Sequence, residues 1–231
     1  MTTSGLGSRF ADRRDAGRAL ARAMQARTFD DPVVLALPRG GVPVGFEVAK
    51  ALSAPLDVLM VRKIGAPGHE EYGIGAVVDG GAHQVIIDEA AARMVGASRD
   101  YIDFQTARQL AEIERRRALY RTGPPVSLRH RDVIVVDDGI ATGGTIRAAL
   151  QGLAKTNPAR IILAVPLAPA EALSELRGLC DQVICLASPS PFYAVGAHYR
   201  DFSQTEDEEV IGLLGQARLW QGQREHSATS P

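Results

Sequence analysis

The chain has 231 residues, enough for one large α/β domain with a substantial core and short for two independent domains. Its 26 basic and 27 acidic residues give a formal net charge of -1, which argues against an electrostatic surface for nucleic acid or an anionic membrane. No apolar run has the length of a membrane span, and residues 1–10 lack the apolar core of a signal peptide, so we expect a cytoplasmic protein. Cys180 and Cys185 are too few for a disulfide framework and are expected to be reduced core thiols.

The first segments predict a covering helix and then a buried strand. Residues 1–8 are small and polar and are expected to be disordered, and a helical pattern of apolar residues begins near Asp12. Residues 33–37 form an apolar run suited to a buried strand, and the turn P-R-G-G-V-P follows it. Arg39 offers a fixed cationic fork for phosphate, while two glycines permit close approach of the backbone, although a Gly-Gly turn can also be only a turn.

The next segment places charged residues at the end of a predicted strand. A helix over residues 42–52 leads to a strand over 56–61, after which Arg62 and Lys63 precede a Gly- and Pro-rich stretch that we expect to be a mobile loop over residues 64–75. A solvated loop would also be charged, but it would not explain why the charges lie at a ligand-binding edge of the sheet. Residues 74–87 alternate around an Asp-Gly-Gly turn and predict a hairpin.

A long amphipathic helix is predicted over residues 98–121. Its apolar stripe consists of Ile102, Leu110, Ile113 and Tyr120, and a Gly-Pro-Pro sequence follows it. We interpret this helix as an arm for packing or for oligomer contacts rather than as a lid over a substrate.

The stretch from Val133 to Thr145 reads V-I-V-V-D-D-G-I-A-T-G-G-T and is the most informative part of the chain. Its four β-branched residues predict a strand buried on both faces, so Asp137 and Asp138 emerge at the carboxyl end, where open α/β sheets bind ligands. Two adjacent carboxylates there can accept hydrogen bonds from both hydroxyls of a ribose. The Gly- and Thr-rich turn then leads into a helix, whose N-terminus suits a phosphate. The alternative is an ordinary strand-to-helix connection with solvated aspartates.

Strand and helix continue to alternate after this stretch. Helices over residues 144–155 and 169–177 and strands over 161–165 and 182–186 argue for a parallel sheet. Residues 188–203 break the alternation and are rich in aromatic residues, Pro and Gly, and the aromatic residues could simply fix a loop to the core. Thr205 and Glu208 form a capping box that begins a last helix over residues 205–218, and residues 222–231 are expected to be disordered.

The stretch V-I-V-V-D-D-G-I-A-T-G-G-T resembles the 5-phosphoribosyl-1-pyrophosphate (PRPP) loop of type I phosphoribosyltransferases, most closely the adenine-type form. The usual nucleotide motifs, G-x-x-x-x-G-K-[ST] and G-x-G-x-x-G, are absent. The resemblance implies an open, mostly parallel sheet flanked by helices, in a single domain over residues 9–221. Its core would span about 33–187, with an inserted helical arm over about 98–121, a small hood over about 188–204 and a C-terminal helix over about 205–218.

The resemblance also implies roles for individual residues. Those that would bind PRPP are Arg39, Gly40, Gly41, Arg62, Lys63, Asp137, Asp138, Ala141, Thr142, Gly143, Gly144 and Thr145. A Mg²⁺ ion would bind together with PRPP at the two aspartates. Lys63 would contact pyrophosphate, and Glu71, in a loop that closes over the reacting groups, is the acid/base candidate, with His69 as its competitor. Phe192 and Tyr193 would stack on the acceptor.

The implied reaction is transfer of the phosphoribosyl group from PRPP to a small, nucleobase-like acceptor, through a nitrogen, with release of pyrophosphate. We expect a homodimeric salvage enzyme of nucleotide metabolism without nucleic acid or membrane partners. Ala141 stands where hypoxanthine-type enzymes place an aspartate, which puts a hypoxanthine or guanine acceptor in doubt. A PRPP-binding regulator without transferase activity is the main alternative. A PRPP synthetase fits less well because such chains contain two domains of this kind.

Overall fold

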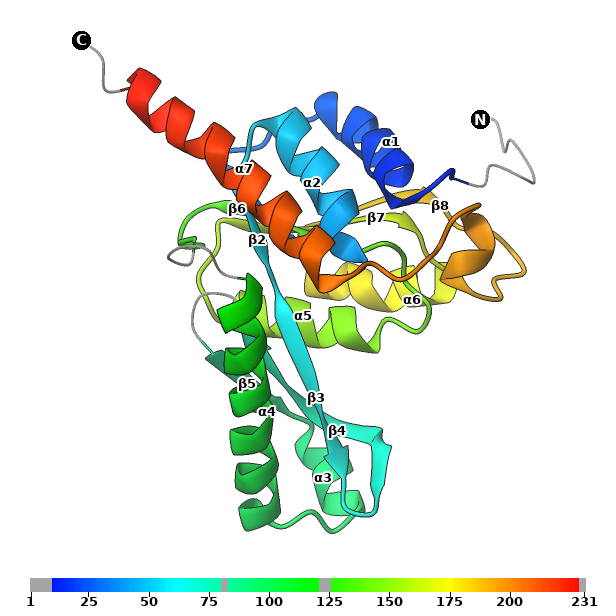
Figure 1. The fold of residues 1–231 in the computed structure, drawn as a ribbon. Helices are drawn as coiled ribbons and strands as arrows, with labels where there is room; N and C mark the ends of the chain where they lie inside the picture. Colours follow the sequence, from blue (N-terminus) through cyan, green and yellow to red (C-terminus); the bar gives the residue numbers. More distant parts are fainter. Residues whose placement is uncertain (1–9, 80–82, 121–125, 229–231) are drawn as a thin grey trace.

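The computed structural model describes residues 10–79, 83–120 and 126–228, with side chains described as far as Trp220 (Figure 1). Its centre is a five-stranded sheet in which all neighbouring strands are parallel, in the order β2-β1-β6-β7-β8. These strands are β1 (Val33–Ala36), β2 (Leu56–Val58), β6 (Asp132–Val136), β7 (Arg160–Leu167) and β8 (Gln182–Ala187). The predicted open parallel sheet is confirmed.

Helices cover both faces of this sheet, as Figure 1 shows. One face carries α1 (Arg13–Gln25), α2 (Gly41–Leu52) and α7 (Asp207–Ala228), and the other carries α5 (Gly144–Ala154) and α6 (Ala170–Leu176). Ile134 and Val136 of β6 pack in the layer of α1, α2 and α7, whereas Val133 and Val135 pack in the layer of α5 and α6. Because both faces are covered, residues 133–136 of β6 are all apolar and do not alternate with polar residues.

A second, three-stranded antiparallel sheet is formed by β3 (Met60–Ala66), β4 (His69–Asp79) and β5 (His83–Ile87). The single strand predicted over residues 56–61 is therefore wrong, because it divides at Leu59 into β2 and β3. The loop predicted over residues 64–75 is also wrong, since these residues form the β3–β4 hairpin, and the mobility of this segment stays a prediction. A Cβ on Gly65 would lie 2.4 Å from the Glu70 carbonyl oxygen, so this glycine permits close backbone approach within the hairpin. The hairpin of β4 and β5 agrees with the prediction.

The inserted segment contains a short helix α3 (Glu89–Met94) and the long helix α4 (Arg99–Tyr120), which matches the predicted long helix. Figure 1 shows α4 lying along the three-stranded sheet. Ile102, Ile113 and Tyr120 are buried, and Leu110 packs against the same core at partial exposure. The Tyr120 hydroxyl donates to the Asp207 carboxylate at the start of α7. Helix α4, which packs on the three-stranded sheet, is thus linked to a helix that covers the five-stranded sheet. The Gly-Pro-Pro stop lies outside the described residues.

The segment after β8 has no strand and contains one short 3-10 helix, Val195–His198. Tyr199 is buried, its ring packs with those of Phe10 and Phe202, and Phe192 packs against the same small cluster, so these residues fix the segment to the core. Tyr193 is exposed and does not take part. A second 3-10 turn, Arg177–Leu179, ends α6.

The C-terminal helix is longer than predicted. Helix α7 begins at Asp207 and continues to Ala228, past the predicted end at residue 218, so the predicted disorder of residues 222–231 is wrong for 222–228. Thr205 is buried just before the helix. Residues 1–8 and 229–231, also predicted to be disordered, lie outside the described residues. In the part of the chain that the structure describes, no helix has the length and apolarity needed to cross a membrane.

Candidate phosphoribosyl-binding site

The carboxylate pair lies at the carboxyl end of β6, near the middle of the parallel sheet. The Asp137 carboxylate accepts from the Asp138 backbone N–H at 2.9 Å, and the Asp138 carboxylate accepts from Arg13 Nε at 2.7 Å. The Tyr199 hydroxyl donates to the Asp138 carbonyl oxygen at 2.5 Å. These contacts fix the Asp138 side chain together with its backbone N–H and carbonyl groups.

Both carboxyl groups are unfavourable places for negative charge in the free protein. Burial, and then the charge of Asp138, raise the pKa of Asp137 well above its ordinary value. Burial also raises the pKa of Asp138, although the hydrogen bond and the charge of Arg13 oppose that rise. Two such groups favour a ligand that supplies hydroxyl donors or a cation.

The turn after β1 lies directly against this pair. Strands β1 and β6 are neighbours, with Ala36 paired with Val136, so the two turns that follow them leave the same edge of the sheet. A Cβ on Gly40 would lie 2.1 Å from Asp138 Oδ2, and a Cβ on Gly41 would lie 2.9 Å from the Val136 carbonyl oxygen. The Gly-Gly pair is thus required by close approach to the aspartates and is more than an ordinary turn.

Arg39 lies at the side of this turn that faces α7. Its guanidinium group is 3.6 Å from the Asp207 carboxylate and 3.8 Å from that of Glu206, and its side chain remains about 30% exposed. A cation held by two partly exposed carboxylates can exchange these partners for an anionic ligand.

The turn over residues 141–145 begins α5. Gly143, in the left-handed conformation with φ 78°, is the residue that precedes the helix, and Gly144 is its first residue. The N-terminal N–H groups of α5 therefore have no intrahelical acceptors and suit a phosphate. Ala141 and Thr142 are exposed, and Thr145 lies at partial exposure on the first turn of the helix.

Lys63 and Arg62 come from the other sheet. They lie inside β3 and not at a strand end of the parallel sheet as predicted, yet a Cβ on Gly144 would lie 3.7 Å from Lys63 Nζ. The Lys63 ammonium group thus reaches the start of α5. Arg62 donates to Glu112 of α4 at 2.9 Å.

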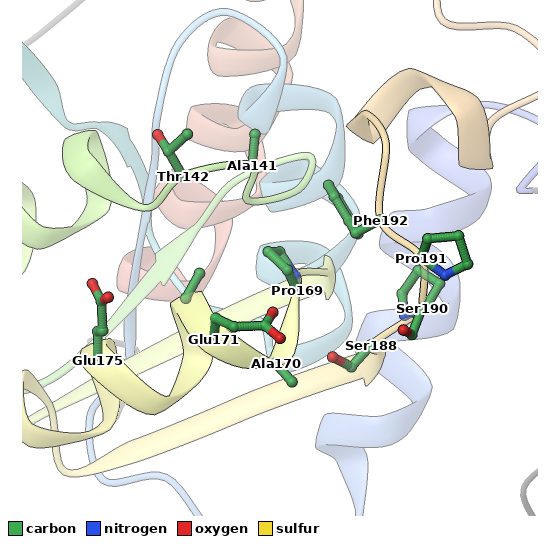
Figure 2. Close-up of a pocket in the computed structure, with 12 residues that line it drawn as sticks. Ala141, Thr142, Pro169, Ala170, Glu171, Glu175, Ser188, Ser190, Pro191 and Phe192 are labelled. Carbon is green, nitrogen blue, oxygen red and sulfur yellow. The ribbon is translucent and has the colours of Figure 1, made fainter.

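A cavity of about 560 Å³ opens beside the same turn (Figure 2). Ala141 and Thr142 line one side of it, α6 and the preceding residue line the second, and residues 188–192 line the third. Figure 2 shows the Glu171 side chain extending from α6 toward the side of the cavity formed by residues 188–192. Phe192 lines the cavity, but Tyr193 is not among the lining residues and is 84% exposed. Of the two aromatic residues proposed to stack on the acceptor, only Phe192 therefore lies at this cavity.

The hairpin residues Glu71 and His69 lie elsewhere. They line a different cavity of about 590 Å³, formed with residues 66–67, 70 and 72 of the β3–β4 hairpin and with Val95. The two cavities have no lining residue in common. This conformation does not bring Glu71 to the carboxylate pair, and its acid/base role stays a prediction.

Sequence reasoning missed residues that contact the site through tertiary packing. Arg13 of α1 and Tyr199 of the hood bind Asp138, and Arg116 of α4 lines a small cavity with Thr145. Arg13 and Asp138 are 125 positions apart, so no local pattern links them.

The carboxylate pair fits a hard cation in its donor chemistry but does not form a complete metal site. No group of three or more His, Cys, Asp or Glu residues that could hold a metal ion occurs among the described residues. Asp137 and Asp138 supply carboxylate oxygens, which Mg²⁺ accepts, and Mg²⁺ typically completes its shell with water and substrate phosphates. The residues present therefore fit a Mg²⁺ ion that arrives with a phosphorylated ligand.

Comparison with known proteins agrees with this geometry. A family model described as "Phosphoribosyl transferase domain" matches residues 9–200. A Mycobacterium tuberculosis protein named "Putative phosphoribosyl transferase" is 43% identical over 209 residues, which are 90% of this chain and 47% of that protein. The chain thus spans about half the length of the curated relatives that it matches. The crystal structure of TT1426 from Thermus thermophilus is 42% identical with a TM-score of 0.78, over 90% of this chain and 98% of that one. The chain belongs to the phosphoribosyl transferase domain family.

Proposed function

We propose that the protein transfers the phosphoribosyl group of PRPP to a nitrogen of a nucleobase-like acceptor and releases pyrophosphate. The observation that carries this proposal is the meeting of three anchoring features at one edge of the sheet. These are the carboxylate pair after β6, the Gly-Gly turn after β1 and the start of α5 with Lys63 beside it. Together they provide acceptors for a diol and two separate sites for phosphate groups.

Each feature corresponds to one part of the substrate. Asp137 and Asp138 would accept from the ribose hydroxyls, and the turn over residues 141–145 would hold the 5′-phosphate with backbone N–H groups and the hydroxyls of its threonines. Arg39, Lys63 and the Gly-Gly turn would bind the pyrophosphate. Holding both ends of PRPP in this way exposes the C1′ atom between them.

In the reaction, the bond from C1′ to pyrophosphate oxygen breaks and pyrophosphate leaves with its electron pair. The acceptor nitrogen then forms the new bond to C1′ and loses a proton. Positive charge develops on the ribose ring in between, as in other glycosyl displacements. The cationic groups would neutralise the leaving pyrophosphate, and a bound Mg²⁺ ion would add to this neutralisation.

The cavity of about 560 Å³ is the proposed acceptor site, with Phe192 as its aromatic surface. Ala141 and Thr142, on the turn proposed to hold the 5′-phosphate, line this cavity, which supports an acceptor site beside bound PRPP. We propose that Glu71 acts as the acid/base by closure of the β3–β4 hairpin over the reacting groups. Homodimeric assembly, a salvage role and a cytoplasmic location stay predictions.

The test is incubation of the protein with PRPP and Mg²⁺, with and without single nucleobases, with pyrophosphate as the measured product. Release that depends on one base supports the proposal and identifies the acceptor. Binding of PRPP without release in the presence of any base would favour the alternative, a PRPP-binding regulator.

A further inference from the structure

The inserted helix α4 reaches the phosphate-binding turns. A small cavity of about 60 Å³ lies where the ends of β1, β3, α4 and α5 meet. Pro38 of the turn after β1, Thr145 of the first turn of α5 and Arg62 of β3 line it, and Arg116 of α4 lines it as well. A helix interpreted from the sequence as a packing or oligomer arm thus places a guanidinium-bearing side chain between the two proposed phosphate sites.

The charges at this place do not balance. Glu112 accepts from Arg62 at 2.9 Å, from Arg116 at 2.8 Å and from Arg115 at 2.9 Å, so one carboxylate is shared by three guanidinium groups. The hydrogen bonds from Arg115 and Arg116 lower the pKa of Glu112 to about 2, which keeps it ionised. Counting these four groups alone, two positive charges are left over, and the charge of Asp207, which also acts on Arg115 and Arg116, offsets part of this excess. Positive charge beside a small cavity that Arg62, Arg116 and Thr145 line favours an anion.

Arg115 and Arg116 differ in where they lie. Arg115 is 61% exposed and does not line the cavity, whereas Arg116 is 33% exposed and does. Arg62 and Arg116 donate to the same Glu112 oxygen, Oε1, at 2.9 and 2.8 Å, so these two cations are close enough to share one ligand. Burial of Arg62, followed by repulsion from Arg116, lowers the pKa of Arg62, in agreement with this proximity.

We propose that Arg116 binds the pyrophosphate group of PRPP together with Arg62, so that α4 supplies a cation for the leaving group. This inference rests on the proposed function and adds a binding residue that the PRPP stretch and the Gly-Gly turn do not contain. Glu112 holds the two arginines in place in the free protein. The pyrophosphate would then pair with the positive charge that the single Glu112 carboxylate does not neutralise.

The experiment measures binding of inorganic pyrophosphate and of ribose 5-phosphate, each with Mg²⁺, by calorimetry. Arg116→Gln should weaken pyrophosphate binding by about 10-fold or more, the effect of losing a hydrogen bond between charged groups. Arg115→Gln is the matched control, because it removes a neighbouring partner of Glu112 but not a cavity residue, and it should change the affinity less than about threefold. Arg116→Lys should retain part of the affinity, because the charge remains without the planar fork.

Ribose 5-phosphate affinity should be unchanged in all three variants. Equal pyrophosphate affinity in the Arg116→Gln and Arg115→Gln proteins would overturn the inference, and so would an equal loss for both ligands in Arg116→Gln, which would indicate a general structural defect. The proposed function fails separately: wild-type protein that binds PRPP but releases no pyrophosphate with any nucleobase contradicts transfer and leaves the comparison of the arginine variants valid.

Discussion

At the scale of single residues, Asp137 shows a conflict between ligand binding and stability. Its carboxylate is proposed to bind the ribose hydroxyls, yet burial and its neighbour raise its pKa in the free protein. Asp137→Asn and Asp138→Asn should each weaken PRPP binding with Mg²⁺ by about 1.5–3 kcal/mol, the usual contribution of a hydrogen bond to a charged group. Calorimetry measures this loss, and unchanged affinity in both variants contradicts the assignment.

The same residue predicts a pH dependence of stability. Because the folded-state pKa of Asp137 lies above its ordinary value of 3.8, the folded chain holds the proton more tightly than the unfolded chain. The free energy of unfolding therefore falls as the pH rises above that value, by at most about 1.4 kcal/mol per pH unit for one group, until the folded pKa is passed. Asp137→Asn lacks this loss, so its stability relative to wild type should increase from about pH 5 to about pH 8.

Urea denaturation at the two pH values, without PRPP and with a chelator, measures this difference. A stability difference between wild type and Asp137→Asn that does not change with pH would show that Asp137 titrates in the folded protein as it does in the unfolded chain.

Gly40 predicts a defect from an added methyl group. A Cβ at this position would lie 2.1 Å from Asp138 Oδ2, so Gly40→Ala must displace the carboxylate or the turn. We expect a loss of about 1–3 kcal/mol in the free energy of unfolding, typical of overpacking, together with weaker PRPP binding. Gly178→Ala is the control, because a Cβ there would have no heavy atom within 4 Å. If Gly40→Ala and Gly178→Ala have the same denaturation midpoint and the same PRPP affinity, the close approach of Gly40 to Asp138 is contradicted.

At the scale of elements, the hood separates two aromatic residues that the sequence places side by side. Phe192 lines the proposed acceptor cavity, and Tyr193 is 84% exposed outside it. Phe192→Leu should raise the acceptor KM several-fold, since an aromatic contact contributes about 0.5–1.5 kcal/mol beyond its buried area, and should leave the KM for PRPP unchanged. Tyr193→Leu should change neither value. Steady-state kinetics with both substrates measure this, and a larger effect of Tyr193→Leu would place the acceptor elsewhere.

The β3–β4 hairpin carries the second prediction at this scale. If the hairpin closes over the reacting groups, Glu71→Gln should lower kcat by about 10²- to 10⁴-fold while PRPP binding persists. Glu70→Gln is the matched control, because Glu70 is the adjacent residue and lies 3.7 Å from Arg108 of α4. A loss of activity confined to His69→Asn would transfer the role to the imidazole. Wild-type activity of both the Glu71 and the Glu70 variants would exclude both carboxylates.

At the scale of the whole molecule, the sequence predicts the parallel sheet well and the second sheet poorly. The runs that became β1, β6 and β7 are continuously apolar and lie between Pro, Asp and Gly, which is typical of strands covered on both faces. In the hairpin, glycines such as Gly65 and Gly75 resemble loop residues in sequence, but they permit close approach to neighbouring backbone. Local composition cannot distinguish these two uses of glycine.

In the candidate site, too, local motifs were predictable from the sequence and tertiary contacts were not. The turns after β1 and β6 were predictable because each is a continuous motif at the end of a strand. The contacts of Asp138 with Arg13 and Tyr199 depend on how α1 and the hood pack, and neither residue lies in a motif. The position of Phe192 in the cavity and that of Tyr193 outside it also depend on packing, because the two residues are adjacent and chemically similar.

The pairing of Ala36 with Val136 has a consequence for how this fold can acquire new specificity. Loss of one residue from β6 would shift the carboxylates by about 3.3 Å along β1 and reverse which face each side chain of the strand occupies. The half of the site proposed to bind PRPP therefore tolerates little change in length. The hood, which forms one side of the proposed acceptor cavity, belongs to neither sheet and has no such register constraint. We therefore expect relatives to diverge in acceptor while retaining one donor by changes at residues 188–192, which line the cavity, whereas Tyr199 of the same segment contacts Asp138.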